Sequence, residues 1–359
     1  MKINGIAYRS VWRDQAGSAV RIFDQTRLPW AVEELRLSRW EDCAEAIRSM
    51  RVRGAPLIGA VAAYGVALAM EADAGTLDPV LEALNATRPT AINLRWALDR
   101  QRSRLHNLPP AQRAAAAWAE ADAIADDDAE TCRRIGENGL PLLAEIAARK
   151  GRVQVLTHCN AGWLATVDWG TALAPIYMAH DTGLDVHVWV DETRPRNQGA
   201  ALTAFALGAH GVKHTVVADN AGGHLMQHGE VDIVLVGTDR VTRQGDVANK
   251  IGTYLKALAA HDNGVPFWVA LPHSTLDMRV RDGVAEIPIE ERGAAEVTEM
   301  TGRTADGRIE TVRVVADGSG AANPAFDVTP ARLVTGLVTE RGRCAANEAA
   351  LLAMYPEKA

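Results

Sequence analysis

The sequence predicts an α/β protein whose larger part is a doubly wound parallel sheet. From residue 150 onward, short apolar runs alternate with segments of helical periodicity, which is the rhythm of right-handed βαβ units. The run over residues 233–236, IVLV, has the length and β-branched content of a strand buried on both faces. Polar loops follow several of these runs, at what would be the carboxyl ends of the strands. Open parallel sheets bind their ligands at those ends.

The composition narrows the class of protein. The chain has 359 residues, more than one typical domain, so we expect two domains. A net charge of −7 without any basic block argues against nucleic-acid binding. The four cysteines are far apart and lack metal-binding spacing, which favours a reducing, cytoplasmic setting and no metal. The uncharged run 54–70 is short for a membrane span, and no apolar signal core precedes it, so we expect a buried helix and no membrane association.

The N-terminal part should contain short strands followed by helices. Residues 8–36 alternate apolar and polar side chains, and residues 40–50 carry apolar side chains at helical spacing. The stretch 77–149 is rich in helical patterns and is punctuated by prolines, among them Pro141. Arg95 lies in an otherwise apolar helical pattern, so it is either paired with a carboxylate or turned toward a ligand.

A basic turn at residues 51–56 precedes the buried helix, and Pro56 suits the first turn of that helix. Arg53 and the free backbone N–H groups near Gly54 and Ala55 therefore meet at a helix start. Such a group either binds an anion or leaves a solvated arginine in front of an ordinary helix.

The C-terminal part alternates strands and helices in a regular order. No GxGxxG follows its first strand, and neither GxxxxGK[ST] nor HExxH occurs, so no nucleotide cofactor or zinc motif is supported. We expect strands over residues 153–157, 186–190, 215–218, 233–236 and 267–271, and helices over 171–181, 198–209, 222–228 and 250–261.

Candidate functional residues follow these strands. Cys159 comes after the first strand and is either an inert buried thiol or a reactive thiolate. Asp239 comes after the strand over 233–236 and either pairs with a neighbouring arginine or acts on a ligand. Gln198 opens a predicted helix in a polar loop. Asn249 and Lys250 are expected at the start of another helix, where a lysine and free N–H groups would bind an anion.

Several segments together resemble one known family, the S-methyl-5-thioribose-1-phosphate isomerases of methionine salvage. This family is related to the regulatory subunits of the translation-initiation guanine-nucleotide exchange factor. The resemblance implies a Rossmann-like catalytic domain, here residues 131–359, after a smaller, mainly helical domain with short strands, residues 1–130. Family members are typically homodimers. The matching segments keep their order along the chain: RGAPLIG (53–59), NLRWAL (93–98), THCNAG (157–162), DETRPRNQGA (191–200), GTDRV (237–241), NK (249–250), PIEER (288–292) and NPAFDVTP (323–330).

The resemblance also implies which residues form the site. Cys159 and Asp239 match the catalytic pair. No cofactor or metal is implied. The positions that match substrate and phosphate binding are Arg53, Gly54, Ala55, Arg95, Gln198, Asn249 and Lys250.

The implied reaction turns 5-methylthioribose 1-phosphate, an aldose, into a ketose 1-phosphate. Because the anomeric phosphate locks the sugar ring, an acid must protonate the ring oxygen, and we assign this step to Asp239. Cys159 could then remove the C2 hydrogen as a base, or it could handle hydroxyl protons while a hydride passes from C2 to C1. The sequence leaves both routes open.

Two other functions remain at this point. The chain could isomerise a related pentose, such as ribose 1,5-bisphosphate or 5-deoxyribose 1-phosphate. Ala201 stands where the family usually has an arginine, which leaves the fine substrate preference open. The chain could instead be a non-catalytic regulatory subunit of the exchange-factor type, although such a subunit has no need for an intact Cys159 and Asp239.

Overall fold

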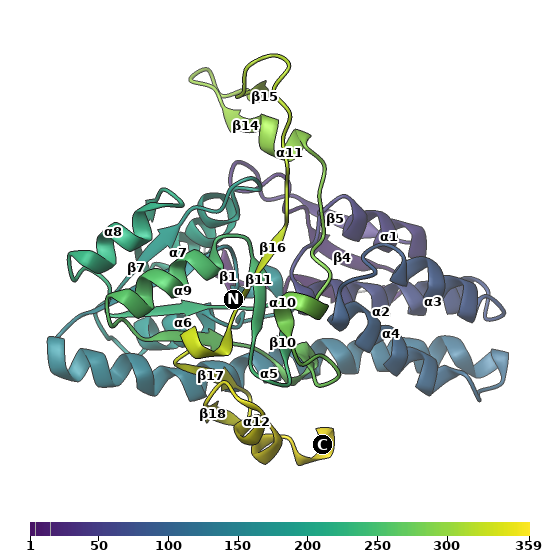
Figure 1. Cartoon of the computed structure of the whole chain (residues 1–359). Coiled ribbons are helices and arrows are strands. Elements are labelled where there is room, and N and C mark those ends of the chain that lie inside the picture. The colour runs from purple at the N-terminus through teal and green to yellow at the C-terminus, as the bar shows by residue number, and fades with distance from the viewer. Residues whose placement is uncertain (4, 15) are drawn as a thin grey trace.

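The computed structural model describes residues 1–3, 5–14 and 16–359 and confirms the α/β fold (Figure 1). Its central sheet has seven strands in the order β18-β17-β12-β9-β6-β7-β8. Neighbouring strands are parallel, except that β18 is antiparallel to β17. Numbered in chain order from β6, the parallel strands follow the doubly wound order 3-2-1-4-5-6. The strands are β6 (Val153–His158), β7 (Val186–Asp191), β8 (Lys213–Val217), β9 (Ile233–Val236), β12 (Phe267–Ala270), β17 (Gly336–Thr339) and β18 (Gly342–Cys344).

Helices cover both faces of this sheet (Figure 1). Successive side chains of a strand point to opposite faces, so Val155 packs in the hydrophobic cluster that contains α6 and α7, whereas Leu156 packs in the cluster that contains α8 and α9. This burial on two sides explains why the strands read as continuous apolar runs. The covering helices are α6 (Leu173–Asp181), α7 (Ala204–His210), α8 (Ala221–Gln227) and α9 (Thr253–Asp262).

Two of the predicted helices differ from the observed ones. The helix expected over 198–209 begins as a π-helical turn, Gly199–Thr203, before α7. The helix expected over 250–261 begins only at Thr253, because residues 247–250 form strand β11. The prediction that Asn249 and Lys250 lie at a helix start is therefore wrong. Both residues lie in a strand of a second, smaller sheet.

The N-terminal part has the short strands and helices that the sequence predicts. The strands are β1 (Lys2–Ile3), β2 (Ile6–Ala7), β3 (Val11–Arg13), β4 (Val20–Phe23) and β5 (Glu34–Leu37). Gln15 lies within the stretch expected to form strands but outside the described residues. The helices are α1 (Trp40–Arg48), α2 (Ala55–Ala72), α3 (Leu77–Asn85) and α4 (Ile92–Leu105).

Helix α2 is the centre of the N-terminal core. It is long and apolar enough to cross a membrane, but most of its residues are buried within the protein. It packs against α1, α4 and α5, which explains why it is hydrophobic on all sides. The expected buried helix is thereby confirmed.

A single long helix, α5 (Pro110–Lys150), connects the two halves of the molecule. Pro141 lies inside this helix and does not end it, contrary to the sequence-based expectation. Residues of α5 up to Ala129 pack in the N-terminal core, and residues from Ile135 onward pack beside the central sheet. Residues from the first strands, such as Met1 and Phe23, also pack in the second cluster, so a division at residue 130 stays a prediction.

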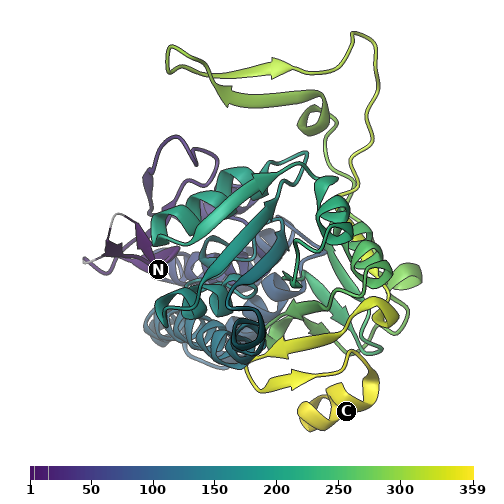
Figure 2. The same ribbon diagram turned by 90° about the vertical axis from the view of Figure 1, so that its left-hand side faces the viewer.

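A second sheet, in the order β13-β10-β11-β16, and a projecting hairpin complete the fold. The hairpin, β14–β15, stands away from the body in both views (Figures 1 and 2). These elements are β10 (Arg240–Thr242), β11 (Val247–Lys250), β13 (Leu276–Asp277), β14 (Glu299–Arg303), β15 (Ile309–Arg313) and β16 (Phe326–Thr329), with short helices α10 (Gly283–Glu286), α11 (Ala295–Thr298) and α12 (Glu348–Met354).

Candidate active site

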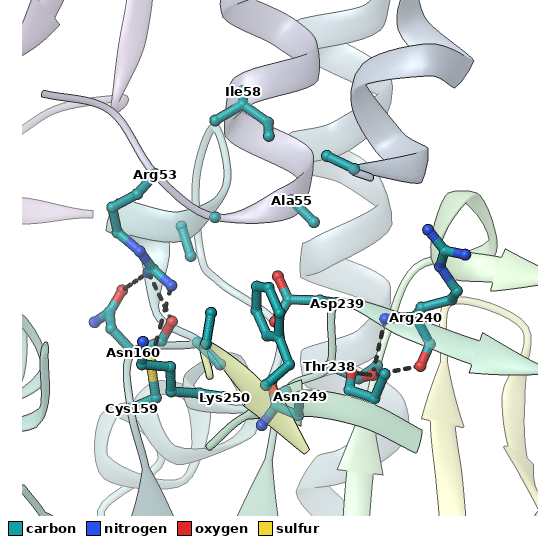
Figure 3. A pocket seen from close by; sticks show the side chains of 18 of the residues that line it. Arg53, Ala55, Ile58, Cys159, Asn160, Thr238, Asp239, Arg240, Asn249 and Lys250 are labelled. Atoms are coloured by element: carbon teal, nitrogen blue, oxygen red, sulfur yellow. Dashed lines mark hydrogen bonds between the residues drawn. The ribbon is translucent and has the colours of Figure 1, made fainter. Parts of the chain in front are cut away.

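A cavity opens where the strand order of the central sheet reverses. Strands β6 and β9 are neighbours, but the chain leaves β6 toward β7 on one side and continues from β9 toward β12 on the other. Ligands of doubly wound sheets bind in this crevice. Cys159 follows β6, Asp239 follows β9, and both line the cavity beneath the N-terminus of α2 (Figure 3).

The backbone and side chain of Cys159 are firmly held. Its φ of 63° is unusual for a residue other than glycine, and its N–H donates to Thr193 Oγ1 at 2.8 Å. Its Sγ donates to Gln198 Oε1 at 3.0 Å and lies 4.0 Å from a guanidinium nitrogen of Arg53. Burial raises the pKa of the thiol, whereas the nearby charges of Arg53 and Lys250 lower it. Without a ligand, Cys159 is therefore a thiol with cations ready to stabilise its thiolate.

Arg53 reaches the C-terminal half from the turn before α2. Its Nη1 donates to the carbonyl oxygen of Asn160 at 2.8 Å and to Asn160 Oδ1 at 3.0 Å (Figure 3). Gly54 has a φ of 101°, and a Cβ added there would lie 2.4 Å from the carbonyl oxygen of Ala165. Only glycine allows this close approach of the two backbones. Gly54 thus brings Arg53 and Ala55 to the cavity, as the sequence predicts.

Lys250 and Asn249 enter the cavity from strand β11 rather than from a helix start. Lys250 is almost fully buried, and this burial lowers the pKa of its ammonium group. Asn249 is also buried, and its Nδ2 donates to Thr253 Oγ1 at 3.0 Å. Among the described residues, no carboxylate forms a salt bridge with Lys250 or Arg53. Two cations without counter-ions in a cavity favour an anionic ligand.

Asp239 lies on the opposite side of the cavity from Cys159 (Figure 3). Its backbone N–H donates to the carbonyl oxygen of Ala248 in β11 at 3.0 Å. Desolvation by the surrounding walls raises the pKa of its carboxyl, while Arg53, Arg88 and Lys250 act to lower it. A carboxyl with a raised pKa can carry a proton to a ligand, as a general acid must.

One predicted residue lies elsewhere. Arg95 is exposed on α4 and does not line this cavity, although Arg88, just before the same helix, does. Arg88 Nη2 donates to Glu290 Oε2 at 2.9 Å, and Arg292 also binds Glu290 at 2.8 Å. The sequence could have identified Arg88 by its position: it precedes Pro89 in the loop before a helix, much as Arg53 lies in the turn before α2. The RWAL pattern instead points to Arg95.

Sequence reasoning also missed polar residues around the cysteine. His158 lines the cavity together with Asn160, whose Nδ2 donates to Thr203 Oγ1 at 3.0 Å. Arg240 lies on the Asp239 side and pairs with Asp277 at 3.5 Å. His158 and Asn160 flank Cys159 in the sequence, so their place at the strand end could have identified them.

Similarity to known proteins identifies the family of this chain. Residues 51–346 match the Initiation factor 2 subunit family. Over its full length the chain is 68% identical to a methylthioribose-1-phosphate isomerase of Acidiphilium cryptum and 66% identical to one of Gluconobacter oxydans, and it covers 99% of each relative. The chain belongs to this isomerase family.

Solved structures of the family have the same fold. The 5-methylthioribose 1-phosphate isomerase of Pyrococcus horikoshii is 38% identical, with a TM-score of 0.85 over 98% of this chain and 96% of that one. A translation initiation factor eIF-2B delta subunit of A. fulgidus is 36% identical, with a TM-score of 0.81 over 98% of this chain and 100% of that one. The resemblance seen in the sequence is thus confirmed, and the chain is a member of a family of isomerases.

Proposed function

We propose that this protein converts 5-methylthioribose 1-phosphate into 5-methylthioribulose 1-phosphate in methionine salvage. The observation that carries the proposal is the shared cavity of Cys159 and Asp239, in which Arg53 and Lys250 have no carboxylate partner among the described residues. Isomerisation of a sugar phosphate requires an acid, a base and cations that bind the phosphate, and Asp239, Cys159, Arg53 and Lys250 can supply these groups. The names of the closely similar relatives support the same substrate.

In this proposal the phosphate binds to Lys250 and Arg53. A phosphate dianion would supply the negative charge that the buried Lys250 and the half-buried Arg53 lack, and both would donate charge-assisted hydrogen bonds. The N-terminus of α2 at Ala55 would add its backbone N–H groups and the positive end of the helix. Gln198 and Asn249 have polar side chains at the same cavity and would bind hydroxyl or phosphate oxygens.

Asp239 acts as the general acid and base. Its carboxyl protonates the ring oxygen, and the C1–O bond to that oxygen breaks with its electron pair leaving on the oxygen. C1 becomes an oxocarbenium centre stabilised by the phosphate-ester oxygen that it still carries. The raised pKa favours the protonated carboxyl that this step needs. After ring opening, the same carboxylate accepts a hydroxyl proton.

Cys159 handles the second proton in one of two ways. As a thiolate it removes the C2 hydrogen as a proton, which gives an enol phosphate. This enol is then protonated at C1 while the C2 hydroxyl gives up its proton, so that the C2 carbonyl forms. Alternatively, the C2 hydrogen passes to C1 as a hydride while Cys159 and Asp239 exchange hydroxyl protons with the substrate. The substrate is oxidised at C2 and reduced at C1 in both routes, so neither route consumes a redox cofactor.

An assay with 5-methylthioribose 1-phosphate tests the proposal, with ribose 1,5-bisphosphate and 5-deoxyribose 1-phosphate as competing substrates. We expect the ketose product and the highest kcat/KM with the methylthio sugar. Faster turnover of another pentose would replace the substrate but keep the chemistry. Absence of turnover on all three would favour the regulatory role, because the similar A. fulgidus protein is a translation initiation factor subunit.

We further propose that the protein is a homodimer and acts in the cytoplasm. Family resemblance supports the dimer, and the widely spaced free cysteines suit a reducing compartment. Light scattering coupled to gel filtration measures the mass in solution, which should be about twice that of one chain.

A further inference from the structure

At the wall of the cavity, three charged or titratable side chains form a buried cluster that the reaction described above does not use. His158 is the last residue of β6, and it pairs in register with Asp191, the last residue of β7. Their side chains are 1% and 0% exposed, and His158 Nδ1 lies 2.5 Å from Asp191 Oδ2. The ammonium group of Lys256 in α9 lies 2.8 Å from the same carboxylate oxygen. Such a cluster is costly to bury, so it needs a structural or functional reason.

The hydrogen bonds of His158 define its protonation. Its Nε2 lies 2.8 Å from the carbonyl oxygen of Ile251, which can only accept, so Nε2 carries a proton. Its Nδ1 lies beside Asp191 Oδ2, the same oxygen that accepts from the Lys256 ammonium and is therefore placed as an acceptor. Both ring nitrogens then donate, and the ring is a buried imidazolium. Asp327 is another carboxylate near the cluster; burial raises its pKa, whereas His158 and Lys256 act to lower it.

The Ile251 carbonyl belongs to the turn that directly follows Lys250. The next residue, Gly252, has a φ of 101°, and a Cβ added there would lie 3.0 Å from the His158 ring. On its other side, the N–H of Gly252 donates to Asp327 Oδ2 at 2.7 Å. The turn is therefore held between the imidazole ring and a carboxylate, with room for glycine alone.

We propose that His158 is a positioning residue, a doubly protonated imidazolium that links the strand end carrying Cys159 to the turn carrying Lys250. It bonds to Asp191 and the Ile251 carbonyl, and does not itself contact the reacting atoms. Through these bonds it sets the separation between the thiol and the phosphate-binding ammonium group. This inference rests on the phosphate site proposed above, because it assigns His158 a role in arranging that site.

The protonation state can be measured in the wild-type protein, independently of any substrate. Nitrogen-15 NMR of the histidine rings at about pH 8, where an ordinary histidine is neutral, should show protons on both nitrogens of His158. His187 on the neighbouring strand β7 is an internal control, since burial lowers its pKa and its ring should be neutral. The signal of His158 is assigned by its absence in His158→Gln. A single neutral tautomer at His158 would overturn the proposal.

Substitutions test the positioning role. His158→Leu removes both donors, whereas His158→Gln keeps one uncharged donor that can reach the Ile251 carbonyl. Binding of inorganic phosphate, followed by the rise in Tm with phosphate concentration, should weaken about 10- to 100-fold in His158→Leu and less in His158→Gln. His187→Gln, at a ring that bonds Gln154 and Thr215, should change phosphate affinity by about twofold at most.

The other possible results also test the positioning role of His158. Unchanged phosphate affinity in a folded His158→Leu protein would refute the positioning role, and if that variant fails to fold, His158→Gln and the wild-type NMR spectrum still give the answer. If the methylthio sugar proves not to be the substrate, the phosphate and NMR measurements retain their meaning. A failure of the proposed function is thus separate from a failure of this inference.

Discussion

The two strand ends that meet at the cavity hold their functional side chains differently. After β6, the Cys159 sulfur is fixed by Gln198 and lies beside Arg53, and its backbone is tied to Thr193. After β9, Asp239 is tied through its backbone N–H to Ala248, and among the described residues its carboxyl forms no hydrogen bond. The thiol has one defined position, whereas the carboxyl is free to turn. A carboxyl that must reach both the ring oxygen and a hydroxyl of the substrate needs that freedom.

The cations on the two sides differ in the same way. On the Cys159 side, Arg53 and Lys250 have no carboxylate partners among the described residues. On the Asp239 side, Arg88 is paired with Glu290 and Arg240 with Asp277. Burial opposes ionisation of Glu290, but Arg88 and Arg292 hold its pKa below the ordinary value. The unpaired side is therefore suited to bind a dianion, while cations from both sides, Arg53, Arg88 and Lys250, lower the pKa of Asp239 against the effect of its burial.

The largest effect should come from the free carboxyl. Asp239→Asn should lower kcat about 10²- to 10⁴-fold, because an amide cannot transfer the proton that opens the ring. Binding should survive, since the phosphate is held on the other side of the cavity. Calorimetric titration with the methylthio sugar phosphate measures this, with the exposed Asp262→Asn as control. If binding and turnover disappear together, Asp239 has a structural role.

The fixed thiol should come next. Cys159→Ser should lower kcat about 10²- to 10³-fold, since a hydroxyl at this position remains protonated and is a far weaker base. Cys344→Ser is the matched control, because Cys344 does not line the cavity. Steady-state kinetics of both variants give the comparison. Near-normal turnover of Cys159→Ser would reduce the cysteine to a packing residue.

The unpaired cations should affect binding more than chemistry. Lys250→Met should raise KM about 10- to 100-fold with a smaller change in kcat, because a phosphate contact remote from the reacting carbons stabilises substrate and transition state alike. Lys213→Met, at an exposed lysine that pairs with Asp185, should leave KM unchanged. A drop in kcat at constant KM would contradict the phosphate assignment.

Substitution of Arg88, on the paired side, should have the smallest effect on turnover but should change its pH dependence. Arg88 lowers the pKa of Asp239, and Glu290 raises it. Arg88→Met removes the first influence and leaves the second, so the pKa of Asp239 should rise. An acid with a higher pKa stays protonated to higher pH, so the alkaline limb of the kcat/KM profile should move to higher pH. The value of kcat/KM at the optimum should fall about tenfold.

Profiles of kcat/KM against pH for Arg88→Met, wild type and the exposed control Arg104→Met test this expectation. A limb that moves to lower pH, or one that does not move, would show that the Arg88–Glu290 pair does not influence the acid.

The strand ends were predictable from the sequence, but the side chains that enter from elsewhere were not all found. Cys159 and Asp239 directly follow clear apolar runs. The carboxyl ends of parallel strands lie at one edge of the sheet, where ligands bind, so the place of both residues could be predicted. Lys250 was assigned to the right cavity on the wrong element, because the short strand β11 has too few residues to show a period. Arg88 lies in the loop before α4, and Arg95 lies seven positions later, within α4. Only packing decides which of the two reaches the cavity.

Pro141 shows the limit of local rules. A proline inside a helix loses a hydrogen bond and costs about 3 kcal/mol. Here α5 lies so close to α6 that a Cβ at Gly139 would come within 2.4 Å of Pro175. This contact between distant parts of the chain outweighs the local preference, and sequence patterns cannot reveal it.

The continuity of α5 has a consequence for motion and for folding. A helix of 41 residues is about 60 Å long, and it contributes side chains to both hydrophobic clusters. Because the same helix packs in both clusters, we expect the two halves to move little relative to each other and substrate entry to depend mainly on the loops at the mouth of the cavity. A fragment that ended within α5 would expose an apolar stripe to water, and the halves should therefore unfold together in one cooperative transition.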